Sequence, residues 1–282
     1  MKKSLLAASA LALAVSAGSA FAADLPSKKA PLLLPPPPPP PALWTGFYVG
    51  LNAGYTWSDS NAVTVGSGSF PPFNPIVGIA GSGVLAPNSD GFIGGGQIGY
   101  NYQFANSFIA GLEADIQGVA GSNNTASSFG AFGPLASSIS ASKSIDYLGT
   151  VRGRVGYLFT PSLLVYGTGG LAYGQANLSS SIFQTVGGLV GTSSSAFSDT
   201  RVGWTAGGGV EWLFLPKWSA KVEYLYYDLG AVSTSSVISF TGIPVPVAAT
   251  ASTTRFNGHV VRAGVNYHFN LFSPAAPVVA KY

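Results

Sequence analysis

From Trp44 onward, apolar side chains alternate with small or polar ones in long runs, separated by stretches that lack the pattern. A period of two marks a β-strand whose two faces meet different surroundings, and no part of the chain shows a convincing helical period. The alternation predicts eight strands, at residues 47–57, 92–104, 108–119, 145–159, 163–176, 201–213, 218–230 and 258–269.

The connections between these predicted strands are alternately long and short along the whole chain. Three are tight turns, at 105–107, 160–162 and 214–217, and four are long, at 58–91, 120–144, 177–200 and 231–257. An up-and-down meander then places every long connection at one end, as in transmembrane barrels with short periplasmic turns and longer extracellular loops. The strands also reach the ~9–11 residues that cross a bilayer, whereas ordinary strands have about 5–6. We therefore expect an all-β fold, an eight-stranded antiparallel up-and-down transmembrane β-barrel with four long extracellular loops and short periplasmic turns.

The two faces of the predicted strands carry different side chains. In the strand at 145–159, Val151 and Val155 lie on one face and Arg152 and Arg154 on the other. A cation on the lipid face at mid-bilayer costs about 2–4 kcal/mol, so the charged face is predicted to line the lumen. The same phase in the other strands collects four acids and four bases in this lumen network: Glu113, Asp115, Arg152, Arg154, Glu211, Lys221, Glu223 and Arg262.

Aromatic side chains gather near both ends of the predicted strands. A strand in a soluble core has no reason to place them there, whereas a membrane barrel carries an aromatic girdle at each interface. The residues assigned to the two interfacial girdles are Tyr55, Trp57, Tyr100, Tyr102, Phe104, Tyr147, Tyr157, Trp204, Trp212, Trp218, Tyr267 and Phe269.

The N-terminal segment before the strands has two parts. Residues 1–22 have a basic start, an apolar middle and a small-residue end, which is the layout of a secretory signal peptide, with a retained membrane anchor as the alternative. Residues 23–43 contain seven consecutive prolines and predict a stiff periplasmic linker, with a docking motif as the alternative. The predicted barrel covers residues 44–269, and residues 270–282 form a C-terminal extension.

The composition excludes several classes of function. Charged residues make up only 8% of the chain, against about 25% in typical soluble domains, so much of the surface is not expected to face water. Nucleic acid is excluded as a partner because it needs clustered Lys and Arg. The chain has no cysteine, which excludes disulfides, thiolate metal sites and cysteine nucleophiles.

Several segments together give the chain a family resemblance. They include "WTGFYVGLNAGYTW", "GFIGGGQIGYNYQF", "SIDYLGTVRGRVGYLF", "RVGWTAGGGVEWLF" and the final-strand "VVRAGVNYHF". The chain resembles the small porin-like outer-membrane proteins of Gram-negative bacteria, the opacity-type surface antigens with an eight-stranded barrel. Such proteins often end on an aromatic strand with a terminal Phe. Phe269 holds that place here, but further residues follow it, and the proline run is a second departure.

Two motifs that suggest chemistry have simpler explanations. The glycines of 94–99 and 167–172 fit loose dinucleotide-binding patterns, but both lie inside predicted strands, whereas such a site needs a helix after the glycines. The only histidines are His259 and His268, expected at the outer rim and the periplasmic mouth, and no sequence feature joins either to a serine and a carboxylate. The sequence therefore indicates no enzyme, no catalytic residue, no metal site and no cofactor.

Two functions stay open at this point. The protein is expected in the cell outer membrane with both termini periplasmic, in a structural or porin-like role in the envelope. The alternative is a surface antigen or adhesin that binds through its four long loops. The lumen charges either form a closed plug or a gate for water and small ions, because an eight-stranded barrel is just wide enough for side chains to fill it. The expected partners are outer-membrane lipid, lipopolysaccharide and the barrel-assembly machinery, while peptidoglycan or a surface ligand, conductance and oligomeric state are left open.

Overall fold

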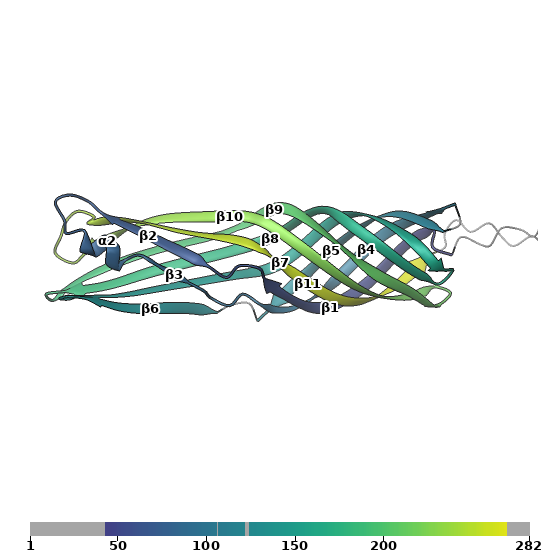
Figure 1. The fold of residues 1–282 in the computed structure, drawn as a ribbon, viewed down its shortest axis with the longest axis horizontal. Coiled ribbons are helices and arrows are strands. Elements are labelled where there is room, and N and C mark those ends of the chain that lie inside the picture. Colours follow the sequence, from purple (N-terminus) through teal and green to yellow (C-terminus); the bar gives the residue numbers. More distant parts are fainter. Residues whose placement is uncertain (1–42, 106, 122–123, 270–282) are drawn as a thin grey trace, which may run out of the picture. The chain divides into compact units, whose positions relative to one another are not determined.

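A computed structural model of the protein describes residues 43–105, 107–121 and 124–269 (Figure 1). The predicted signal peptide, the predicted linker except for residue 43, and the C-terminal extension lie outside the described residues. Among the described residues, no helix is both long and apolar enough to cross a membrane.

The described chain is almost entirely β-structure, with eleven strands where the alternation predicted eight. A single short helix, α2 (Ile76–Ala80), interrupts the strands. The strands are β1 (Gly46–Ser58), β2 (Val63–Ser69), β3 (Gly83–Leu85), β4 (Gly91–Phe104), β5 (Phe108–Ala120), β6 (Thr125–Phe132), β7 (Leu135–Thr160), β8 (Leu163–Val186), β9 (Leu189–Leu215), β10 (Trp218–Phe240) and β11 (Ala248–Phe269).

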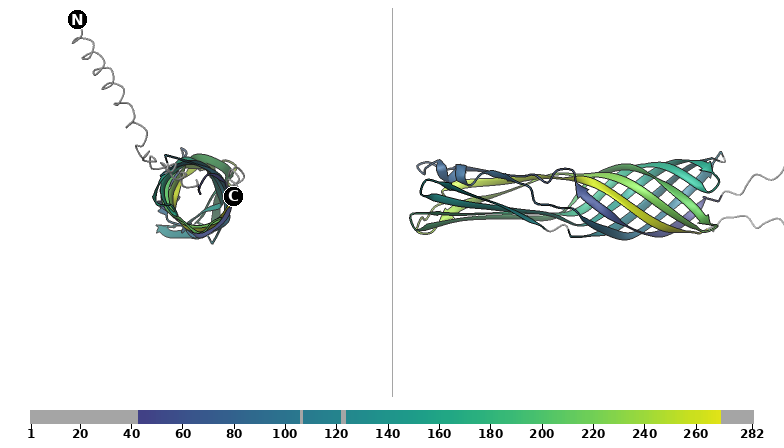
Figure 2. Two further views of the ribbon diagram at one scale, coloured as in Figure 1. Left: turned by 90° about the vertical axis from the view of Figure 1, so that its right-hand side faces the viewer. Right: turned by 60° about the horizontal axis from the view of Figure 1, so that its bottom comes forward.

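Eight of these strands pair in sequence and return to their start. The order is β1-β4-β5-β7-β8-β9-β10-β11, and β1 also pairs with β11. Tyr55 of β1, for example, pairs with Phe92 of β4 on one side and with Val261 of β11 on the other. Seen end-on, the strands form a ring (Figure 2, left). We call the interior of this ring the lumen.

Three of the four segments predicted as long loops, 120–144, 177–200 and 231–257, are largely strands, which corrects the loop prediction, while 58–91 contains only the short β2, β3 and α2. β7 to β11 continue well past their predicted ends, and β2, β3 and β6 add further pairs beside them, as the left half of Figure 1 shows. Two irregularities in strand register explain why the sequence pattern did not predict that these strands continue. The β7–β8 register shifts between Ile145 and Leu148, and the β10–β11 register shifts between Asp228 and Ala231, where Gly230 has φ +84°. Each shift breaks the alternation at the point where a strand seemed to begin or end.

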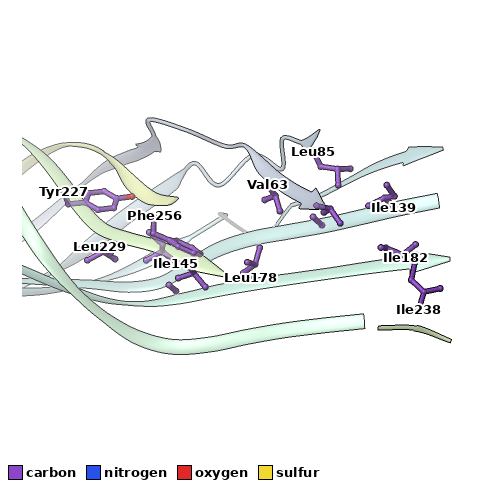
Figure 3. Close-up of a cluster of buried hydrophobic side chains, with 14 of the residues drawn as sticks. Val63, Leu85, Ile139, Ile145, Leu178, Ile182, Tyr227, Leu229, Ile238 and Phe256 are labelled. Atoms are coloured by element: carbon purple, nitrogen blue, oxygen red, sulfur yellow. The ribbon is translucent and has the colours of Figure 1, made fainter. Parts of the chain in front are cut away.

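We call residues 63–85, 125–142, 178–198 and 232–254 the distal extension. An apolar cluster runs through it and continues into the adjoining part of the ring (Figure 3). In the extension the cluster includes Val63 of β2, Ile139 of β7, Ile182 of β8 and Ile238 of β10. Burial of such side chains supplies the stabilisation that an ordinary surface loop lacks. The distal extension is therefore a packed body rather than a set of loops.

A smaller apolar cluster lies at the opposite, short-turn end. Trp44, just before β1, is 1% exposed and packs with Ile109, Leu158, Leu164 and Leu213. Its indole Nε1 donates to the Pro161 backbone oxygen at 3.0 Å, and its ring meets His268 edge-on at 5.7 Å between centroids. Side chains thus fill the lumen at this end as well.

Candidate functional site: a buried charge network in the lumen

The eight charged residues of the predicted lumen network come together in the middle of the ring. Five strands supply them: β5 carries Glu113 and Asp115, β7 carries Arg152 and Arg154, β9 carries Glu211, β10 carries Lys221 and Glu223, and β11 carries Arg262. None is more than 5% exposed. Successive side chains of a strand point to opposite faces. The charged residues therefore point inward, while neighbours such as Val151 and Val155 point outward and are 50% and 64% exposed.

Glu113 is the centre of the network, since it contacts all four bases. Its carboxylate accepts from Arg152 Nη2 at 2.5 Å and from Lys221 Nζ at 2.9 Å. Arg154 Nη1 lies 3.5 Å and Arg262 Nη2 lies 3.6 Å from the same carboxylate. One acid on β5 therefore links bases on three other strands.

A second set of contacts crosses the lumen. Arg152 on β7 reaches Glu223 on β10 at 3.0 Å, and it also contacts Asp115 at 2.9 Å. Arg262 on β11 contacts Glu223 at 2.5 Å and Asp115 at 2.9 Å. The Arg152–Glu223 and Arg262–Asp115 pairs join strands that are not neighbours in the ring, so the network connects different walls across the lumen.

Two buried tyrosines complete the network, and sequence reasoning missed both. Tyr48 donates to Glu113 at 2.6 Å and accepts from Arg154 Nη1 at 2.9 Å, and Tyr166 donates to Glu223 at 3.0 Å. The Arg154 guanidinium lies over the Tyr166 ring at 4.2 Å, a cation–π contact, and its Nη2 bonds Glu211 at 2.7 Å. The alternation along the strand could have predicted the inward position of Tyr48, because Tyr48 lies between Phe47 and Val49, which both point outward.

Uncharged side chains extend the network onto β1 and β4. Gln97 donates through Nε2 to Asn266, which in turn donates through Nδ2 to Glu211 at 2.7 Å. Asn52 donates to Gln97 at 3.1 Å. These amides occupy the lumen face of β1, β4 and β11 and leave less room around the charges.

The lumen network carries no net charge. Four acids and four bases neutralise each other, and each lies within contact distance of an opposite charge. Moving single charges out of water is costly, and only close geometry with added hydrogen bonds offsets that cost. The network meets both conditions through its direct pairs and its tyrosine, threonine and amide partners. Its arrangement is that of side chains packed to fill a lumen.

A serine, a histidine and a carboxylate also meet in the lumen, which the sequence did not indicate. Ser219 Oγ donates to Glu211 at 2.5 Å and lies 2.8 Å from His268 Nε2, and all three side chains are buried. In a hydrolase the histidine stands between the serine and the acid. Here Ser219 donates to the acid itself, and the same His268 Nε2 that lies near the serine is 3.5 Å from Glu211, so the cluster is part of the packed network.

His259 lies at the other end of the strands, on the outward face. Its ring stacks on Trp57 at 5.4 Å and on Tyr224 at 5.9 Å, and its Nδ1 lies 2.7 Å from the Tyr224 hydroxyl. Asp59 lies 3.5 Å from Nε2. His259 is therefore one member of an aromatic cluster.

Most of the aromatic residues assigned to the girdles lie near strand ends, but Tyr147 and Trp204 lie midway along the lengthened β7 and β9. Many contact each other, as Tyr55 does with Phe92 at 5.3 Å and Trp218 with Tyr267 at 5.1 Å. The glycine motifs at 94–99 and 167–172 lie within β4 and β8, as expected. A Cβ on Gly95 would lie 2.0 Å from the Ile116 backbone oxygen, so this glycine allows close approach of β5.

Comparison with known proteins agrees with this architecture. The sequence matches the family described as "Outer membrane protein beta-barrel domain" over residues 5–269. It is 36% identical over 271 residues to the 31 kDa outer-membrane immunogenic protein of Brucella melitensis biotype 1, covering 95% of this chain and 100% of the relative. It is 28% identical over 274 residues to the 25 kDa outer-membrane immunogenic protein of Brucella abortus biovar 1, covering 95% and 98%.

Among solved structures, the outer membrane protein OprG from Pseudomonas aeruginosa aligns with a TM-score of 0.39 and 11% identity, covering 80% of this chain and 97% of that one. The sequence match spans all the described strands, and the relatives are similar over nearly their full length. The chain is therefore an outer-membrane protein that belongs to the outer membrane protein beta-barrel domain family.

Proposed function

We propose that this protein is a closed, structural barrel of the outer membrane that carries a rigid surface-exposed body. In this proposal β1, β4, β5 and β7 to β11 cross the membrane over their short-turn halves, and the distal extension stands outside the cell. Both termini then lie on the periplasmic side. The barrel anchors the extension in the envelope and conducts no ions.

The observation that carries this proposal is the burial of all eight lumen charges in one neutral network. A conducting pore needs side chains that leave a continuous water path, and this network joins opposite walls directly. The apolar cluster in the distal extension and the Trp44 cluster at the short-turn end add two further layers that exclude water. Of the two interpretations open from the sequence, the plug has the better support.

The outward faces support the proposed membrane contact. Leu51, Leu112 and Val155 are each more than 60% exposed, which favours lipid around this part of the ring. The same faces would meet lipopolysaccharide in the outer leaflet and the assembly machinery during insertion. Peptidoglycan is a further candidate partner for the proline-rich segment before Trp44.

Planar-bilayer recording of the folded protein tests the closed barrel. We expect no stable conductance steps from the native protein. Arg152→Ala should also stay silent, because the apolar cluster of the distal extension is still in place. Insertion is verified in the same preparation by a heat-dependent shift in gel mobility. Stable ion-sized steps from the native protein, altered in size by Glu223→Ala, would contradict the proposal and favour a gate.

Surface binding is the second candidate function, and one feature favours it. The distal extension exposes large apolar side chains such as Ile79, Phe129 and Val245, which are 61%, 74% and 51% exposed. Exposed apolar side chains that cluster at one end mark an interaction site more often than chance. Because the distal extension is packed around a buried apolar cluster, point substitutions rather than deletions are the appropriate test. Loss of cell or ligand binding by Phe129→Ser in a correctly folded protein would support this candidate.

A further inference from the structure

We propose that the tip of the distal extension contains a binding site for the hydrocarbon part of a small, uncharged amphiphile, such as a medium-chain alcohol. The site is a cavity where the four lengthened connections of the chain meet. It lies far from the lumen network along the strands. The inference goes beyond the proposed function but shares with it the placement of the distal extension outside the membrane.

All four connections line the cavity. Phe73 and Val77 come from the segment between β2 and β3, and Phe132 comes from the end of β6. Leu189 begins β9, Phe240 ends β10, and Ile243 comes from the turn between β10 and β11. No charged side chain lines it. Because each connection contributes, the cavity is a product of the whole tip rather than of one flexible loop.

The size of the cavity limits its occupant. Its volume is about 310 Å³, near the lower end of the ~300–1,000 Å³ of ligand sites. A dry apolar cavity of ~150 Å³ holds one benzene molecule, so this one fits roughly two fused rings or a chain of about ten carbons. A partner protein would need an interface of about 800 Å² on this side, far more than one cavity mouth provides.

The absence of charged residues at the tip indicates the chemical class of the ligand's head group. The four ranges of the distal extension contain no Asp, Glu, Lys, Arg or His. A charged head group brought to the cavity mouth would find no ion partner and would lose hydration, whereas a hydroxyl can bond backbone groups and the abundant Ser and Thr. An uncharged head group is therefore favoured over a carboxylate or an ammonium group.

Buried polar contacts fix the segment that carries one wall of the cavity. The Gln184 side chain is fully buried, and its Nε2 donates to the Val77 backbone oxygen at 2.9 Å. Ser137 Oγ donates to the Ala80 backbone oxygen at 2.6 Å. These bonds fix α2 and its flanking residues against β7 and β8. The Gln184 Oε1 atom is buried and has no partner among the described residues, so this region has spare hydrogen-bonding capacity.

Photolabelling in single-copy lipid nanodiscs tests the proposal. The probe is a ten-carbon alcohol that carries a diazirine in its chain, and labelled peptides are mapped by mass spectrometry. We expect saturable labelling of the cavity residues, together with unsaturable labelling of lipid-facing positions such as Leu112 and Val155. Competition by 1-decanol should be at least about tenfold stronger than by decanoate, a factor that corresponds to a modest penalty for a charged group.

Two variants and a control make the result specific. Leu189→Trp narrows the cavity and should remove labelling at the tip while labelling of the lipid face continues. Phe132→Ala enlarges the cavity and should shift the best competitor from a ten-carbon to a longer alcohol. Val84→Trp, at a position 68% exposed and outside the cavity lining, should change neither result.

The outcomes separate this inference from the proposed function. Labelling confined to the lipid-facing positions, equal competition by decanol and decanoate, or tip labelling that Leu189→Trp leaves unchanged would overturn the inference alone. Unsaturable labelling all over the outward face of the distal extension would show that this region lies in lipid. That result would overturn both the inference and the proposed topology.

Discussion

Arg152 on β7 and Glu223 on β10 meet at 3.0 Å, although β8 and β9 lie between their strands in the ring. The contact spans the lumen rather than one strand-to-strand step. It exists because both side chains point inward at the same height, where Glu113 and Asp115 share the same guanidinium. The stability of the ring therefore depends on charges that belong to no single hairpin.

Removal of one charge from this network should be strongly destabilising. Arg262→Met leaves Glu223 and Asp115 without one of their bases in a buried site, which is expected to lower the free energy of unfolding by about 3–5 kcal/mol. Urea unfolding of the detergent-folded protein measures this. The comparison is Arg255→Met, since the Arg255 side chain is 58% exposed and pairs with one acid, Asp228, so its loss should lower the midpoint less than Arg262→Met does. Equal midpoints for the two variants would contradict a stabilising lumen network.

The proposed position of the membrane gives a second prediction. Val155 and Val84 are both well exposed, at 64% and 68%, but only Val155 lies on the part of the ring proposed to face lipid. Val155→Arg should lower folding stability in lipid vesicles by about 2–4 kcal/mol. Val84→Arg places the same charge on the distal extension, in water, and should fold like the native protein. Equal loss for both variants would place the membrane boundary elsewhere.

Lys143, between the distal extension and the proposed membrane part of β7, should make stability depend on pH. Its Nζ donates to the backbone oxygens of Ser60 at 2.6 Å and Arg255 at 2.7 Å, and burial lowers its pKa from 10.5 to about 8. The unfolded chain therefore binds more protons between these two values, so the free energy of unfolding rises with pH from about 8 to 10.5. The rise, up to about 3 kcal/mol, is lost as the pH falls through 8.

Resistance of the distal extension to proteolysis, compared on both sides of this pH window, measures the Lys143 effect. Lys143→Met keeps much of the packing but removes the titrating amine, so its resistance should be nearly independent of pH. A native protein whose resistance is flat across the window, or a variant that keeps the full rise, would show that another group is responsible.

Trp44 provides a fourth prediction, at the short-turn end. Trp44→Ala removes a buried side chain and its bond to Pro161, and it should lower the free energy of unfolding by about 3–5 kcal/mol. Trp218 is the matched control at the same end, since it is 43% exposed on the outward face. Trp218→Ala should have the smaller effect in unfolding experiments. The reverse order would mean that the lipid face, and not the Trp44 cluster, stabilises this end.

The sequence predicts the strands around the lumen network well because the two faces of these strands differ sharply. Arg152 and Arg154 alternate with Val151, Gly153 and Val155, so a period of two assigns both arginines to one face without any knowledge of the fold. Which acid each arginine contacts cannot be obtained in this way. The Arg152–Glu223 contact depends on how the ring closes and how its strands are staggered, and local alternation carries no information about either.

The distal half was predicted poorly because its alternation has little contrast. Around Ile139, serines occupy both the inward position at Ser137 and the outward positions at Ser138 and Ser140. Apolar patterning then resembles that of a loop, although the backbone pairs continuously with β8. The cavity at the tip was likewise beyond the sequence, since its lining comes from four segments that only tertiary packing brings together.

The pairing of β1 with β11 has a consequence for how the molecule is made. Phe47 of β1 pairs with Phe269 of β11. The first strand of the ring therefore gains its second pairing partner only after the last strand of the ring has been synthesised. Until then β1 presents an open edge of unpaired backbone groups, the kind of edge that joins other chains. Ring closure therefore requires β11, and so does the complete lumen network, because Arg262 lies on that strand.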